Sequence, residues 1–106
     1  MYGLIGSFKA APGKRAELIT ILLSDVGAMP GCMSYVVAED PADAETLWIT
    51  EVWDTQASHK GSLELAAVKS AIAKAMPLIA GFGEHRELNV VGGHGLSAAA
   101  GATPAR

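Results

Sequence analysis

The sequence predicts one α+β domain whose elements follow the order β-α-β-β-α-β. Segments rich in β-branched and aromatic residues alternate with segments whose apolar residues recur at helical spacing. Pro-Gly pairs and a short polar segment over residues 40–45 separate them. A chain of 106 residues is long enough for one such domain. This order is the ferredoxin-like arrangement, in which both helices cover one face of a four-stranded antiparallel sheet.

The first strand and the first helix are expected in the first quarter of the chain. A strand is expected over residues 2–10. Pro12-Gly13 is then expected to open a helix, because proline at an early helical position loses no hydrogen bond. Leu18, Leu22 and their apolar neighbours recur on one face of this helix, with polar residues on the other.

The second and third strands are expected to form a hairpin. A Pro-Gly pair at 30–31 ends the first helix, and residues 32–39 are rich in Val, Tyr and Met. The polar residues 40–45 suit a turn, and residues 46–53 form the next β-prone run. We therefore expect these two strands to be antiparallel neighbours.

The second helix is expected in two pieces. The first covers about 56–60. The second carries an apolar stripe at spacings of three, four and four: Leu65, Val68, Ile72 and Met76. Gly61 is expected to let the two pieces meet at an angle, and Pro77 is expected to end the second piece.

A more polar strand is expected to complete the sheet, over about residues 82–91. The domain is thus expected to span 1–91. Residues 92–106 form a Gly/Ala-rich tail without periodicity, which we expect to be mobile or to lie on a partner.

Charge and composition exclude several classes of protein. The formal net charge is −3 and the eight Lys and Arg residues are scattered, so neither a nucleic-acid patch nor a polybasic membrane anchor is expected. The first residues lack a basic segment and a long apolar run, so neither a signal peptide nor a membrane span is expected. The single Cys32 cannot form an internal disulfide, which favours a reducing, cytoplasmic setting.

Both faces of the predicted sheet are apolar. On the third strand, Leu47, Ile49 and Trp53 share one face, whereas Trp48 and Val52 share the other. Leaving the second face in water would cost several kcal/mol, at roughly 25 cal/mol per Å² of apolar surface. A second copy of the chain is the simplest cover, so the sequence favours a face-to-face homodimer. A longer loop that folds back onto the sheet is the alternative.

The third strand ends with a carboxylate and an indole on one face. Residues two apart in a strand point the same way, so Glu51 and Trp53 are neighbours, next to the apolar Ile49. An ionisable group beside a large π-system on an apolar surface suits a small aromatic ligand. The alternative is a half-buried strand in which Trp53 is core and Glu51 reaches water.

These features resemble the antibiotic-biosynthesis monooxygenase family over residues 1–91. The resemblance rests on the element order, the Pro-Gly pair before the first helix, the Pro-Gly-Cys that opens the second strand, and Glu51-x-Trp53 followed by a helix start containing Asp, Gln and Ala. It implies a dimeric α+β barrel with an aromatic substrate in a cavity beside the sheet and helices. It also implies oxidation of a phenolic or quinol substrate by O₂, with no metal, flavin or haem cofactor.

The resemblance suggests roles for residues on and near the third strand. Glu51, when partly desolvated, would act as the general base, and His59 on the following helix is the alternative base. A Glu51 that is buried against the backbone or a partner subunit is the competing interpretation. Four side chains would bind the substrate, with the indole stacking on its ring: Trp53, Tyr35, Ser34 and Ile49.

The sequence departs from the family pattern at two positions. Many members carry a histidine nine residues after the tryptophan, where this chain has Ser62. His59, three residues earlier, either shares that helix face or points to solvent. Some oxygenases carry an asparagine four residues before the tryptophan, where this chain has Ile49. Haem-degrading relatives use an asparagine on the first strand, and the only asparagine here is Asn89, so haem degradation is disfavoured.

Two functional classes remain open. His59, His85 and His94 have no second ligand at metal-binding spacing, so no metal site is expected. The first class is a cofactor-independent monooxygenase that oxidises a hydroxylated aromatic, such as a quinol or polyketide, with O₂. The second is a non-catalytic dimeric barrel that binds a small apolar or aromatic molecule.

Overall fold

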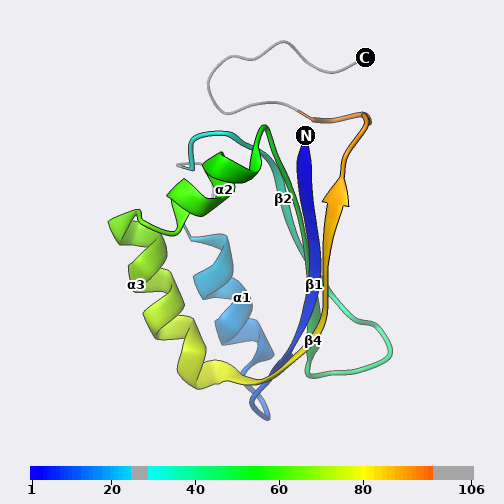
Figure 1. The fold of residues 1–106 in the computed structure, drawn as a ribbon. Helices are drawn as coiled ribbons and strands as arrows, with labels where there is room; N and C mark the ends of the chain where they lie inside the picture. The colour runs from blue at the N-terminus through cyan, green and yellow to red at the C-terminus, as the bar shows by residue number, and fades with distance from the viewer. Residues whose placement is uncertain (25–28, 97–106) are drawn as a thin grey trace.

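The computed structural model describes residues 1–24 and 29–96, which form a two-layer α+β fold with helices on one side of an antiparallel sheet (Figure 1). The predicted fold class is confirmed. The elements, in chain order, are β1 (Tyr2–Ala10), α1 (Arg15–Leu23), β2 (Cys32–Glu39), β3 (Thr46–Trp53), α2 (Gln56–Ser62), α3 (Ala66–Ala75), the 3₁₀ helix η2 (Met76–Leu78) and β4 (Ile79–Asn89).

The sheet has the strand order β2-β3-β1-β4, and all three pairings are antiparallel. Tyr2 lies opposite Trp53, and Leu4 lies opposite Glu51. Residues directly opposite each other in an antiparallel pair share a face. The helix-covered face therefore carries the carboxylate and the indole, and Val52 belongs to the face that the described helices leave uncovered.

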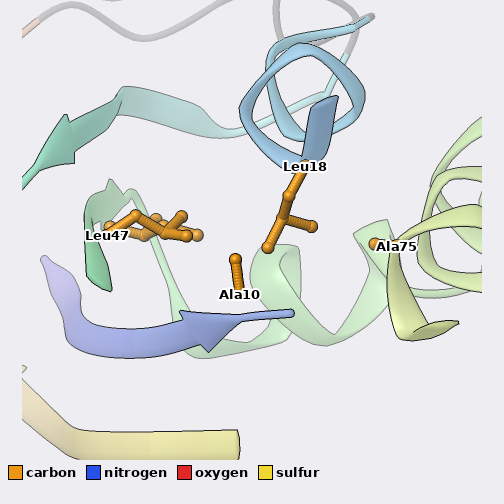
Figure 2. Packing of buried hydrophobic residues seen from close by; sticks show 5 residues of the cluster. Ala10, Leu18, Leu47 and Ala75 are labelled. Carbon is orange, nitrogen blue, oxygen red and sulfur yellow. The ribbon is translucent and has the colours of Figure 1, made fainter. Parts of the chain in front are cut away.

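The core lies between the sheet and α1, with α3 at its side (Figure 2). Leu18 from α1 and Leu47 from β3 are fully buried and meet there. Burial of a leucine side chain stabilises a fold by about 1.5–3 kcal/mol. The cluster comprises Ala10, Leu18, Leu47, Ile49 and Ala75. The small residues from β1 and α3 allow these elements to approach one another closely.

The first helix begins later than predicted. Pro12 precedes α1, whose first residue is Arg15, so the prediction that proline occupies an early helical position was wrong. Gly13 has a φ of +75°, a left-handed conformation that glycine adopts without strain. Residues 11–14 are closed by a hydrogen bond from the Lys14 amide to the Ala11 carbonyl, of 2.9 Å. The Pro-Gly pair thus forms the turn that connects β1 to α1.

The second helix is in two pieces, but Gly61 is not the joint. Gly61 lies inside α2, and the chain bends at 63–65. The amides of Leu63, Glu64 and Leu65 each bond to the carbonyl three residues earlier, which tightens and ends the helix. Leu65 is then extended, with ψ of 136°, and α3 starts after it.

The last strand begins three residues earlier than predicted and ends at Asn89. Pro77 lies within η2, where its missing N–H is not required, and the chain enters β4 directly afterwards. The Leu78 carbonyl accepts a hydrogen bond of 2.8 Å from Ala11, which fixes this corner. Of the predicted tail, residues 97–106 lie outside the described residues.

The pairing of β1 with β4 is irregular in the middle of the sheet. The register shifts between Gly6 and Phe8, and the Glu84 amide donates a 2.8 Å hydrogen bond to the Ser7 hydroxyl. A Cβ at Gly83 would clash with that hydroxyl, so a larger residue here would force the Ser7 side chain to move and would disturb this hydrogen bond. The irregularity brings Phe82 opposite Phe8 on the helix side. No helix in the described part of the chain is long and apolar enough to cross a membrane.

Candidate active site

Glu51 and Trp53 are joined by a hydrogen bond. The indole Nε1 donates to Glu51 Oε1 over 2.9 Å. Trp53 is only 1% exposed, whereas Glu51 is half-buried. A fully covered indole has no free face for a ligand ring, so Trp53 cannot stack on a substrate in this conformation. Its N–H instead holds the carboxylate in one orientation on the helix-covered face.

His59 lies between two aromatic rings. Its imidazole centroid is 5.4 Å from that of Trp53 in an edge-on arrangement and 5.7 Å from that of Tyr2 in a tilted one. Tyr2 and Trp53 are direct partners in the β1–β3 ladder, so the pairing of the strands sets the spacing of this aromatic clamp. His59 comes from α2, whose first turn is capped by the Thr55 hydroxyl accepting a bond from the Ser58 amide.

The Tyr2 side of the clamp is anchored by β4. The Tyr2 hydroxyl donates a 2.5 Å hydrogen bond to Glu87 Oε2, and Gln56 Nε2 donates to the same oxygen over 3.4 Å. The hydrogen bond to the Glu87 carboxylate raises the pKa of Tyr2 from 10.0 to about 12, with burial adding to the effect. Tyr2 is therefore neutral and held in place across the physiological pH range.

Glu51 and His59 line the same cavity, which has a volume of about 180 Å³. Its wall combines apolar side chains with two carboxylates and two imidazoles: Leu4, Ile5, Gly6, Ser7, Phe8, Ile49, Glu51, His59, Phe82, Glu84 and His85. We call it the polar cavity. Gly6 lies between Ile49 and His85 in the two ladders, and its missing side chain leaves space there.

A second cavity, of about 220 Å³, lies between the sheet and the two longer helices. We call it the apolar cavity. Its lining in the described residues has only two polar side chains, Ser24 and Tyr35, and neither Glu51 nor His59 belongs to it. The candidate chemistry is thus confined to the polar cavity. The two cavities share Phe8 and Phe82, whose rings meet edge to face at 5.3 Å.

The remaining predicted site residues are divided between the two faces of the sheet. Tyr35 lies opposite Glu51, on the helix side. Burial, followed by the charge of Glu51, raises the pKa of Tyr35 well above its usual range, so its hydroxyl stays a hydrogen-bond donor. Ile49 is buried and lines the polar cavity. Ser34 lies opposite Val52, on the uncovered face, so the structure separates it from Glu51.

The position at which many relatives were expected to carry histidine is not part of the cavity wall. Ser62 is 4% exposed, and its hydroxyl donates a 2.6 Å bond to the His59 carbonyl at the end of α2. His59, which is half-buried, lines the polar cavity. Of positions 59 and 62 on this helix, position 59, which carries the imidazole, is therefore the one that faces the polar cavity.

Several residues in and around the site were not found from the sequence, among them Tyr2, Glu87 and Phe82. Tyr2 and Glu87 are 85 positions apart, and only the pairing of β1 with β4 brings them together. Phe82 reaches Phe8 because of the register shift, for which the run Gly-Phe-Gly over 81–83 is the one available signal.

Comparison with known proteins agrees with this architecture. A family model described as antibiotic biosynthesis monooxygenase matches residues 1–74. The chain belongs to this family. A structure from Chloroflexus aurantiacus J-10-fl, provisionally assigned to antibiotic biosynthesis monooxygenase, is 56% identical, with a TM-score of 0.88 over 91% of this chain and 98% of that one.

Two other solved structures, each also provisionally assigned to antibiotic biosynthesis monooxygenase, are more distant. One from Deinococcus radiodurans is 26% identical, with a TM-score of 0.72 over 85% of this chain and 92% of its own. One from Caulobacter crescentus CB15 is 24% identical, with a TM-score of 0.77 over 85% and 89%, and supports the fold alone. No curated protein matches the chain. Family membership supports a monooxygenase-like role in general terms.

Proposed function

We propose that this protein is a cofactor-independent monooxygenase that oxidises a hydroxylated aromatic, such as a quinol, with O₂. One observation carries the proposal: Glu51, oriented by Trp53, and His59, held between two aromatic rings, both line the polar cavity, beside the apolar side chains of its wall. A general base next to apolar walls is what deprotonation of a phenol in a water-poor site requires.

The size of the polar cavity suits a single ring. Apolar cavities of about 150 Å³ are known to hold benzene, and this one has about 180 Å³. The substrate ring would lie against Phe8 and Ile49, with its hydroxyl toward Glu51 or His59. Trp53 then acts as a positioning residue for Glu51. The stacking contacts with the ring would come from the phenylalanines at the edge of the cavity.

The proposed reaction needs electrons only from the substrate. Glu51 or His59 removes the phenolic proton, and the phenolate passes one electron to O₂, which bonds to a ring carbon after the radicals recombine. The O–O bond then breaks. One oxygen atom becomes a ring carbonyl, and the other leaves as water with the phenolic proton and the proton lost from the ring carbon.

We also propose that the protein is a homodimer that pairs through the uncovered face of the sheet. Val36 is 50% exposed and Leu88 is 47% exposed. Both lie on the same face as Trp48 and Val52. Val36 pairs with Thr50, which alternates with those two residues along β3, and Leu88 pairs with Gly3, which in turn pairs with Val52. An exposed sheet face that carries several large apolar side chains is typical of a surface that a partner covers.

The test is O₂ consumption with a panel of quinols, with product mass measured under air and under nitrogen. We expect O₂ uptake and a product about 14 mass units heavier than its substrate, because one oxygen atom is gained and two hydrogen atoms are lost in the base-catalysed scheme. Glu51→Gln should slow turnover by about 10²-fold or more if Glu51 is the base. The matched control is Glu64→Gln, which changes an exposed carboxylate that forms a salt bridge with Lys69, at 3.6 Å.

His59→Gln separates the two candidate bases. If Glu51→Gln turns over normally and His59→Gln is inactive, the base is His59. If quinols bind to the wild type but no O₂ is consumed, the monooxygenase proposal is wrong, and the protein is a ligand-binding barrel.

A further inference from the structure

We infer that the ligand of this site is amphiphilic: a hydroxylated ring that fills the polar cavity and an apolar substituent that fills the apolar cavity. The position of the ring rests on the proposed function. The position of the substituent rests on the connection between the two cavities.

The two cavities meet at one pair of aromatic rings. Phe8 and Phe82 line both cavities and touch edge to face, with centroids 5.3 Å apart. Phe82 is 67% exposed, so few neighbours restrain its ring. It also stands between Gly81 and Gly83 in the irregular part of β4. A small movement of this side chain joins the two spaces, and one molecule can then occupy both.

The chemistry of the apolar cavity selects the kind of substituent. Its space of about 220 Å³ exceeds that of a benzene-sized cavity, about 150 Å³. Carboxylates, imidazoles and ammonium groups are missing from its described lining, and a buried polar group without a hydrogen-bond partner is costly. A second ring or an alkyl chain of similar size therefore fits, whereas a charged or heavily hydroxylated substituent does not.

Two positions with small residues, one in each cavity wall, allow a larger side chain to fill each cavity separately. Gly6 lines the polar cavity, and a Cβ there would come 3.3 Å from the Glu84 carbonyl, which requires a shift of only a few tenths of an ångström. Ala71 lines the apolar cavity from α3, where it is half-buried. Ala73 is exposed on the same helix and belongs to neither cavity lining, so Ala73→Leu is the matched control.

The experiment is a calorimetric titration of the full chain under nitrogen, which prevents turnover. The ligands are hydroquinone and its 2-ethyl, 2-butyl and 2-hexyl derivatives. For the wild type and Ala73→Leu, we expect Kd to fall by about fourfold for each CH₂ that is buried, until the cavity is full. In Ala71→Leu this gain with chain length should be lost. In Gly6→Ala every ligand should bind more weakly, by a similar factor.

Ala67→Leu, at the rim of the same cavity, is a second variant in case Ala71→Leu does not fold. A wild-type Kd that is independent of chain length, a full gain retained in both helix variants, or absence of binding by every ligand overturns the inference. If the chain-length gain is found and no O₂ is consumed under air, the amphiphilic ligand stands and the monooxygenase proposal fails. If O₂ is consumed without a chain-length gain, the reverse holds.

Discussion

The hydrogen bond from Trp53 to Glu51 makes a testable link between stability and the site. Trp53→Phe keeps an aromatic ring but removes the N–H and part of a side chain that is 1% exposed. A hydrogen bond to a charged group contributes about 1.5–3 kcal/mol, and Glu51 is half-buried, so we take the lower end. The smaller buried ring lowers the free energy of unfolding by about a further 1–2 kcal/mol. We therefore expect a loss of about 3 kcal/mol.

Such a loss is large for a domain of this size, because total stabilities are typically about 5–15 kcal/mol. Urea unfolding followed by circular dichroism measures it, and an unchanged m value would show that the unfolded state is not altered. The matched control is Trp48→Phe. Its indole also donates to a carboxylate, Asp40 Oδ2 at 3.0 Å, but on the far side of the sheet from the cavities. This variant should lose less stability and leave the proposed oxidation rate intact.

A double-mutant cycle isolates the hydrogen bond from the change in ring size. Combining Trp53→Phe with Glu51→Leu should give a coupling energy of about 1 kcal/mol or more, since each single variant already removes the bond. A coupling below about 0.3 kcal/mol would refute the reasoning, because residues in contact would then behave as independent sites. Trp53 would in that case be only a core residue.

Three further perturbations probe other parts of the structure. Tyr2→Phe should abolish a phenol titration near pH 12, which is followed by absorbance at 295 nm. Because the pKa of Tyr2 in the folded protein lies above 10.0, the stabilisation from its hydrogen bond to Glu87 is complete below pH 10 and is lost as the pH rises through about 12. A titration near 10 in the folded wild type would contradict this. Trp48→Glu should convert the proposed dimer into monomer or aggregate in sedimentation, and a wild-type monomer at micromolar concentration would exclude the dimer. Gly83→Ala should lower the melting temperature, because its Cβ clashes with the Ser7 hydroxyl; an unchanged value would argue against the irregular register.

The strands were predictable where the local signals were complete. The ranges 2–10, 32–39 and 46–53 are confirmed, because side-chain alternation and a polar turn act within a few residues. The start of β4 was not predictable from Pro77, because proline marks the end of a helix but does not show that the chain passes through η2 straight into the strand. Helix joints were less predictable, because the geometry at 63–65 depends on backbone hydrogen bonds rather than on a marker residue.

The site was predictable in part, for the same reason. The common face of Glu51 and Trp53 follows from strand periodicity alone, and the register agrees with it. Ser34 and Tyr35 are consecutive strand residues and cannot both face one cavity, so only Tyr35 remains beside Glu51. Which residues of β1 and β4 complete the wall could not be read from the sequence, because the register shift decides it.

The burial of Trp53 does not separate a structural role from a functional one. Its indole is buried at the end of β3, orients Glu51 through Nε1, and packs against one side of the His59 ring. The other side, Tyr2, depends on Glu87 of β4. Three neighbouring strands must therefore pair before the carboxylate and the imidazole are held together. The apolar cavity instead depends on how α3 packs on the sheet, so a perturbation of that helix should alter ligand size preference while the Glu51–His59 arrangement persists.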